Sequence, residues 1–156
     1  MKREIIILLF CLTIISLTPV FADDVNMLEA MHITPFSEDT VVTIDGIEFN
    51  IPAEFGEDGL ASVDGEIDTV NDVDMITFSR TYKNENLDNI FIDIHYDELQ
   101  SITDDMIEYN GDEKIINNVT GYYSHEDSLY SFDYVIDGKS VSVTASSEEL
   151  LNKVIM

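Results

Sequence analysis

The sequence predicts an α+β domain, a meandering antiparallel β-sheet of about six or seven strands with two helices packed on one face. Three observations predict this fold class. Several segments alternate apolar and polar residues, Asp-Gly pairs separate some of them, and two segments space their apolar residues as a helix does. Helices on one face of such a sheet bury its apolar side, which is typical of the α+β class.

The clearest element is a hairpin over residues 129–145, LYSFDYVIDGKSVSVTA. Asp137-Gly138 at its centre suits the positive φ values of a two-residue type I′ turn. Such a turn places Tyr134 opposite Val141 and Phe132 opposite Val143. The apolar residues of both strands then share one face, and a slip of one residue would separate them.

A second hairpin is predicted by the same rule for residues 41–44 and 47–51, around Asp45-Gly46. Val42 then lies opposite Phe49. Further strands are expected at residues 60–63, 67–70, 73–82, 89–96, 115–116 and 119–124. Arg80 interrupts an inward-facing apolar row, so we expect it near a sheet edge or paired with a carboxylate.

Two helices are expected to cover the sheet. Asp97 and Gln100 resemble a capping box for a helix with Leu99, Ile102, Met106 and Ile107 in one arc, which Asn110-Gly111 ends. The closing helix is expected to begin at Ser146 as N-cap. Its apolar stripe consists of Leu150, Leu151, Val154 and Ile155.

Residues 1–22 have the features of a secretory signal peptide: a basic start, an apolar run and small residues at Val20 and Ala22. We expect cleavage after Ala22, with a retained membrane anchor as the alternative. Residues 23–40 are then an acidic tether and residues 41–156 a single domain. The single cysteine, Cys11, leaves with the leader, so the mature chain has no disulfide. The expected location is extracellular or the cell surface.

The chain is strongly acidic, with 7 basic and 32 acidic residues and a formal net charge of −25. This charge repels nucleic-acid phosphates and anionic lipid headgroups, so neither nucleic acid nor, after leader cleavage, a membrane is expected as a partner. The expected partner is an unidentified component of the envelope or the extracellular space. A bound cation or a basic partner would relieve the repulsion.

Carboxylates between residues 57 and 74 are candidate calcium ligands, because Ca²⁺ prefers oxygen ligands on such loops. The segment departs from the calcium-loop pattern at Thr69, where glycine is expected, and at Met75, where glutamate is expected. A solvated acidic loop is the alternative, and no other cofactor is expected. The candidate ligands are Asp64, Glu66, Asp68, Asp72 and Asp74.

Asp93 and His95 project from one side of the strand at 89–96, where Ser79 or Thr77 of the neighbouring strand is expected nearby. A catalytic Ser/Asp/His set also needs an oriented base and an oxyanion pocket, and no G-x-S-x-G elbow is present. These residues are better explained as the polar side of the sheet. His32 and His125 belong to other elements, so no histidine pair has metal-ligand spacing.

An aromatic pair and a glycosylation sequon are expected on the surface. Tyr122 and Phe91 are expected on the outer side of the sheet, as an aromatic patch or as ordinary cross-strand packing. Asn118-Val119-Thr120 is an N-glycosylation sequon at an expected turn, which makes Asn118 a candidate glycosylation site.

The segments VVTIDGIEFNIP and IINNVTGYYSHEDSLYSFDYVIDGKSVSVTASSEELLNKVI together resemble a group of uncharacterised short secreted proteins of methane-forming archaea. Asn118 stands where their pattern often has glycine. The resemblance covers about residues 40–156 and implies an extracellular or cell-surface location, but no activity. The order of strands and helices is also similar to that of PsbP-like α/β sandwiches, which implies a non-catalytic accessory role by fold analogy alone.

The sequence therefore predicts a secreted or cell-surface binding or accessory domain that is not an enzyme, with an unknown ligand. The alternatives are an acidic calcium-binding module and, less favoured, a hydrolase that uses the outer sheet face.

Overall fold

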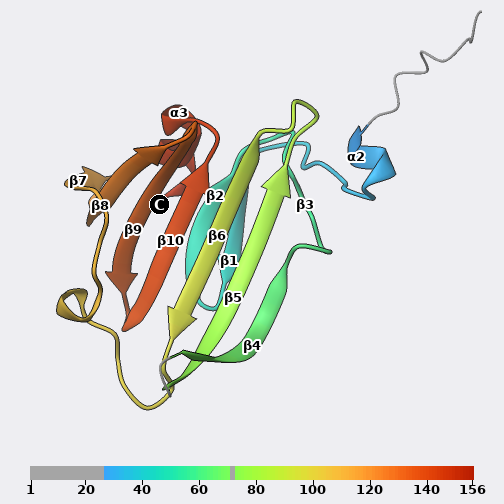
Figure 1. Ribbon diagram of the computed structural model, residues 1–156. Coiled ribbons are helices and arrows are strands. Elements are labelled where there is room, and N and C mark those ends of the chain that lie inside the picture. The colour runs from blue at the N-terminus through green and yellow to red at the C-terminus, as the bar shows by residue number, and fades with distance from the viewer. Residues whose placement is uncertain (1–26, 71–72) are drawn as a thin grey trace, which may run out of the picture.

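The alternating segments form two antiparallel sheets, shown in Figure 1 for a computed structural model that describes residues 27–70 and 73–156. In these residues the larger sheet has eight strands, in the order β3-β5-β6-β10-β9-β8-β7, with β4 also paired to β5; the smaller sheet is the hairpin β1-β2. The strands are β1 Thr40–Ile44, β2 Ile47–Ile51, β3 Gly56–Glu57, β4 Val63–Val70, β5 Val73–Lys83, β6 Asn89–Tyr96, β7 Asp112–Ile116, β8 Val119–Glu126, β9 Leu129–Ile136 and β10 Lys139–Ala145. The helices are α2 Met27–Ala30 and α3 Glu148–Val154, with a 3-10 turn, η1, at Asp104–Met106. The α+β class is confirmed.

The hairpin predicted for residues 129–145 is confirmed as β9 and β10, in the predicted register. Tyr134 lies opposite Val141 and Phe132 opposite Val143. Asp137 and Gly138 have φ values of 52° and 76°, the left-handed geometry that a type I′ turn requires. All four inward side chains are buried, so this hairpin contributes the middle of the core.

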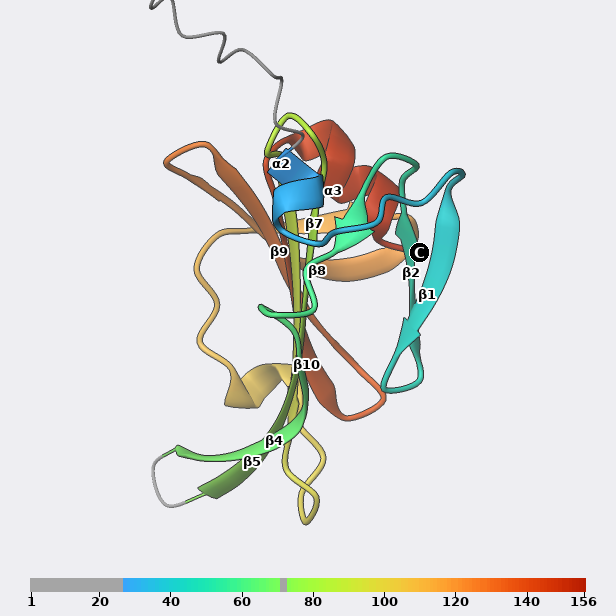
Figure 2. The ribbon, with the colours of Figure 1, turned by 90° about the vertical axis from the view of Figure 1, so that its right-hand side faces the viewer.

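The hairpin β1-β2 is confirmed as well, with Val42 opposite Phe49. Figure 2 shows β1, β2 and α3 on one side of the eight-stranded sheet, and the segment that joins β6 to β7 on the other. The core lies between the sheet and this hairpin. Its fully buried side chains include Phe49, Ile51, Tyr82, Ile90, Ile92, Ile94, Phe132, Val141, Val143, Leu151, Val154 and Ile155.

The closing helix, α3, begins one residue later than predicted. The Ser147 hydroxyl accepts the N-terminal hydrogen bond, from the Leu150 amide at 3.2 Å. The Ser146 hydroxyl instead accepts a bond from the Asn89 amide at 2.7 Å, which joins the end of β10 to the start of β6. The predicted apolar stripe is confirmed, because Leu150, Leu151, Val154 and Ile155 are all buried.

The helix predicted between Asp97 and Asn110-Gly111 is wrong. Residues 97–111, called the crossover below, form an irregular segment that contains only the 3-10 turn η1. The Asp97 carboxylate accepts a bond from the Leu99 amide at 2.7 Å, and the Ile102 amide donates to the Gly138 carbonyl at 2.9 Å. The second bond takes the Ile102 amide away from the Glu98 carbonyl, four residues earlier, to which a helix would have bonded it. The inner face is consequently covered by one helix and a hairpin.

The segment expected as an acidic tether contains α2, Met27–Ala30. From Met27 onward it lies against the domain: Leu28 and Ile33 are buried, and the Phe36 amide donates to the Phe55 carbonyl at 2.8 Å. The predicted signal peptide, residues 1–22, lies outside the described residues.

Of the two short edge strands expected at residues 60–63 and 67–70, the second lies within β4, whereas residues 60–62 form no strand and β4 begins at Val63. Its pairing with β5 shifts register between Val63 and Glu66. Gly65 within this irregularity has a φ of 60°.

Candidate functional site

The outer face, opposite β1, β2 and α3, carries polar side chains across six strands. Strand alternation places them there, because their neighbours along each strand face the core. One row of register partners crosses β5, β6, β10, β9, β8 and β7 and consists of Ser79, Asp93, Ser142, Asp133, Tyr122 and Glu113. The row next to it contains Thr77, His95, Ser140 and Val135.

Asp93 and His95 lie close to the hydroxyls that the sequence predicted. The Ser79 hydroxyl donates to Oδ1 of Asp93 at 2.5 Å, and the Thr77 hydroxyl and Nδ1 of His95 are 3.0 Å apart. Each acidic or basic group is therefore held by its own cross-strand partner. Ser79 with Asp93 and Thr77 with His95 are two separate pairs, not one relay.

Asp133 lies near the centre of this face. Burial raises the pKa of its carboxyl, an effect that a hydrogen bond with Ser142 partly offsets. Both neighbours within its row are polar, Ser142 on one side and Tyr122 on the other. The outer face thus contains a half-buried carboxyl group as well as hydroxyls.

The C-terminal end of the crossover packs on the outer face through an aromatic stack. The rings of Tyr109 and Tyr122 have centroids 4.0 Å apart and an interplanar angle of 11°. The Tyr109 hydroxyl donates to Asp104 at 3.0 Å, and burial, with this bond, raises the pKa of Tyr109. Tyr122 therefore packs against the crossover. Phe91 lies on β6, with β10 and β9 between it and the strand of Tyr122.

Between the crossover and the sheet lies a groove of about 320 Å³, called the crossover groove below. Its floor includes His95 and Ser140, which are register partners on β6 and β10. Apolar side chains from the crossover and from β5 provide most of its lining. The lining residues are Met75, His95, Asp97, Gln100, Ile102, Met106, Ile107 and Ser140.

The sequence does not predict the crossover groove, because the spacing of Ile102, Met106 and Ile107 predicts a covering helix instead. The available signal was the density of Asp, Ser and Thr between positions 97 and 105. Such side chains favour local turns over helices.

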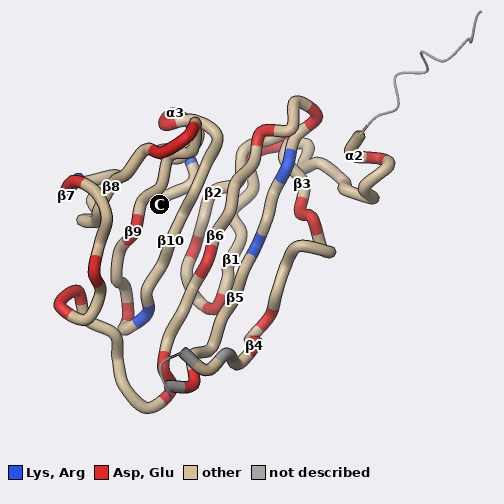
Figure 3. Tube along the Cα trace, in the orientation of Figure 1, with Lys and Arg blue, Asp and Glu red and all other residues tan. Residues whose placement is uncertain are grey.

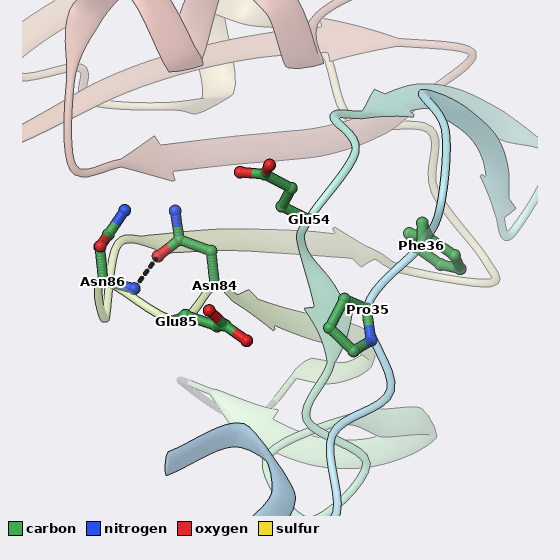
Figure 4. A pocket seen from close by; sticks show the side chains of 6 residues that line it. All are labelled: Pro35, Phe36, Glu54, Asn84, Glu85 and Asn86. Carbon is green, nitrogen blue, oxygen red and sulfur yellow. Dashed lines mark hydrogen bonds between the residues drawn. The ribbon is translucent and has the colours of Figure 1, made fainter. Parts of the chain in front are cut away.

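A smaller hollow of about 280 Å³ lies where the N-terminal segment meets the β5-β6 turn (Figure 4). Its lining includes Pro35, Phe36, Glu54 and Glu85. The Asn84 side chain accepts hydrogen bonds from the amides of Asn86 and Asp88 at 3.0 and 2.9 Å, so its carbonyl oxygen holds the turn together.

The candidate calcium ligands are spread over the β4-β5 hairpin. Asp64 forms an ion pair with Arg80, which also lies 3.3 Å from Glu57, and Asp74 accepts a bond from Thr69 at 2.8 Å. Glu66 is exposed on β4; Asp72 and the side chain of Asp68 lie outside the described residues. Within residues 27–70 and 73–156, no three His, Cys, Asp or Glu side chains form a group that could hold a metal ion.

Arg80 and Lys83 supply positive charge that compensates this acidic segment. Both belong to β5, on which Figure 3 marks basic residues in blue, and Nζ of Lys83 forms an ion pair with the buried carboxylate of Asp58 at 2.7 Å. The expectation that Arg80 pairs with a carboxylate is confirmed.

No helix among the described residues is long and apolar enough to cross a membrane. No family model, curated protein or solved structure matches the chain, so its resemblance to secreted archaeal proteins stays a prediction.

Proposed function

We propose that this protein is a secreted or cell-surface binding module without catalytic activity, and that it holds a small ligand with an apolar body in the crossover groove. The observation that carries the proposal is the groove itself, a concave site with apolar walls and a polar floor. Its volume of about 320 Å³ falls in the range of small-molecule sites, roughly 300–1,000 Å³.

The polar floor supplies the orienting contacts that such a site needs. Because the Thr77 hydroxyl engages Nδ1 of His95, Nε2 is the ring nitrogen left for a ligand. The Ser140 hydroxyl adds a group that both donates and accepts. The ligand therefore carries a hydrogen-bonding group at one end of an apolar body.

Charge selects among such ligands. Asp97 is among the residues that line the groove, and no lining residue is a lysine or arginine. The whole chain has a net charge of −25. Electrostatics therefore favours a neutral or cationic ligand over an anionic one.

The arrangement of Asp93 and His95 supports the non-catalytic interpretation. A hydrolase relay needs a nucleophile bonded to its base and a third group that orients the base. Here Asp93 is bonded to Ser79, whereas His95 is bonded to Thr77.

The test is a titration with three probes of equal length, hexylammonium, hexanol and hexanoate, followed by amide chemical shifts in NMR. We expect hexylammonium and hexanol to shift the amides of His95, Ile102 and Ile107, and hexanoate to bind roughly tenfold more weakly, about 1.4 kcal/mol. Shifts spread evenly over the surface would contradict the proposal.

Ile107→Asn should abolish these shifts, because it places a polar group in the groove wall. The matched control is Ile115→Asn, the same change on β7 at a side chain that is 67% exposed and away from the groove. Retained binding in Ile107→Asn would exclude the groove as the site.

The proposed secretion is tested separately, by determining the N-terminal residue of the protein recovered outside the cell, which should be Asp23.

A further inference from the structure

The turn between β7 and β8 consists of two asparagines with different roles. Asn117 and Asn118 have φ values of 50° and 70°, the left-handed geometry of a type I′ turn. The Asn117 side chain donates to the carbonyls of Asn152 and Ile155, at 3.0 and 2.8 Å, at the end of α3. Asn117 is thus part of the framework of the fold.

Asn118 has no such role. Among the described residues its exposed side chain forms no hydrogen bond, and Thr120 two residues later is exposed as well. Of the two asparagines, only Asn118 begins an N-x-Thr sequon, with valine rather than proline in the middle. The acceptor amide and the hydroxyl that the sequon requires are both accessible.

The turn also borders an open sheet edge. Among the residues that the structure describes, β7 is the last strand on its side of the sheet and pairs only with β8 (Figure 1). Charged residues protect the beginning of this edge, at Asp112, Glu113 and Lys114. Its other end has no charge and includes Ile115, which is 67% exposed. An exposed edge of this kind invites pairing with another chain.

We propose that Asn118 carries an N-linked oligosaccharide, which covers the uncharged end of β7. In the transfer, Nδ2 of Asn118 forms a bond to the anomeric carbon of a lipid-phosphate-linked oligosaccharide. The bond from that carbon to the phosphate oxygen breaks, the lipid phosphate leaves with the electron pair, and the nitrogen loses one proton. The inference depends on export of the chain and not on the crossover groove.

The experiment compares the protein and two variants, Thr120→Ser and Thr120→Ala, each purified from the organism that produces it. Thr120→Ser keeps the sequon, and Thr120→Ala removes it without changing Asn118. Mass spectrometry of the tryptic peptide 115–139 should show an added oligosaccharide on Asn118 in the natural protein and in Thr120→Ser. It should be absent in Thr120→Ala. An unmodified peptide in the natural protein would overturn the proposal.

Covering of the edge is tested on the same samples by light scattering during size exclusion. We expect Thr120→Ala to associate with itself at concentrations where the natural protein is monomeric, and the added change Ile115→Lys to restore the monomer. A glycosylated natural protein whose Thr120→Ala variant stays monomeric would refute the covering role.

Discussion

Each of the five basic residues in the described part of the chain forms an ion pair, and four of these residues join separate parts of the fold. Arg80 and Lys83 hold the acidic segment to β5, at Glu57, Asp64 and Asp58. Other pairs are Lys114 with Glu148, Lys139 with Asp45, and Lys153 with Glu149 within α3. Each basic residue within residues 27–70 and 73–156 therefore contributes to holding the fold together.

Asp58 and Asp133 should respond to pH in opposite directions. The hydrogen bond from Lys83 lowers the pKa of Asp58 below its usual 3.8, although burial opposes this effect. The stabilisation by this pair is therefore complete above pH 3.8 and is lost as the pH falls through the lowered pKa. Burial raises the pKa of Asp133, so its ionised form is unfavourable at neutral pH and protonation on acidification removes that cost.

We expect Asp58→Asn to lower the free energy of unfolding by roughly 1–3 kcal/mol at pH 7, because a hydrogen bond to a charged group is lost and Lys83 is left unpaired. This difference should shrink below pH 3.8. Asp133→Asn, the same substitution on a carboxyl with the opposite shift, should raise the free energy of unfolding at pH 7 and lose this advantage on acidification. Urea unfolding at about pH 7, 5 and 3 measures both. Differences that do not change with pH would contradict the assignment.

At the scale of elements, the hairpins were predictable because two independent signals agreed. The alternation in residues 129–145 and the Asp137-Gly138 turn both predict the same register. A slip of one residue would have moved Phe132 and Tyr134 from the core face to the solvent face. The same alternation correctly placed Ser79 beside Asp93 and Thr77 beside His95.

The crossover was not predictable in the same way, because one signal conflicted with another. The spacing of its apolar residues indicated a helix, whereas Asp97 and the other short polar residues favoured local turns. The conflict was decided by a contact distant in sequence, the bond from the Ile102 amide to Gly138. Periodicity within one segment contains no information about such a partner.

The connection between the β7-β8 turn and α3 should contribute measurably to stability. Asn117→Gly keeps the positive φ accessible but removes both hydrogen bonds to the end of α3, so we expect a loss of about 1–2 kcal/mol. Asn118→Gly is the matched control, since it changes the adjacent residue of the same turn without removing a bond. It should leave stability within roughly 0.5 kcal/mol. Urea unfolding of unglycosylated protein measures both. Equal losses would show that turn conformation matters and the helix contact does not.

For the whole molecule, the dominant property is self-repulsion among carboxylates. Figure 3 shows acidic residues along most of the chain and only a few basic ones. Salt screens repulsion between exposed charges, because the Debye length shrinks as ionic strength rises. Stability should therefore depend on ionic strength more than on which cation is present.

We expect the thermal midpoint to rise by about 5 °C between roughly 0.02 and 0.5 M NaCl. Calcium chloride at matched ionic strength should have no larger effect, because Asp64 is already paired with Arg80 and Asp74 with Thr69. Scanning calorimetry with the two salts is the measurement. A calcium-specific increase at micromolar concentration would instead support a site that includes Asp68 and Asp72.

The contact between Lys139 and Asp45 determines when folding can finish. Nζ of Lys139 donates to the carbonyl and to the carboxylate of Asp45, both at 2.6 Å and across 94 positions of sequence. Phe49 likewise forms a β-bridge to Ile155. The hairpin β1-β2 is therefore synthesised long before the residues that it packs against. Its apolar side stays exposed until Lys139 and Ile155 are in place, so the core is sealed late in folding.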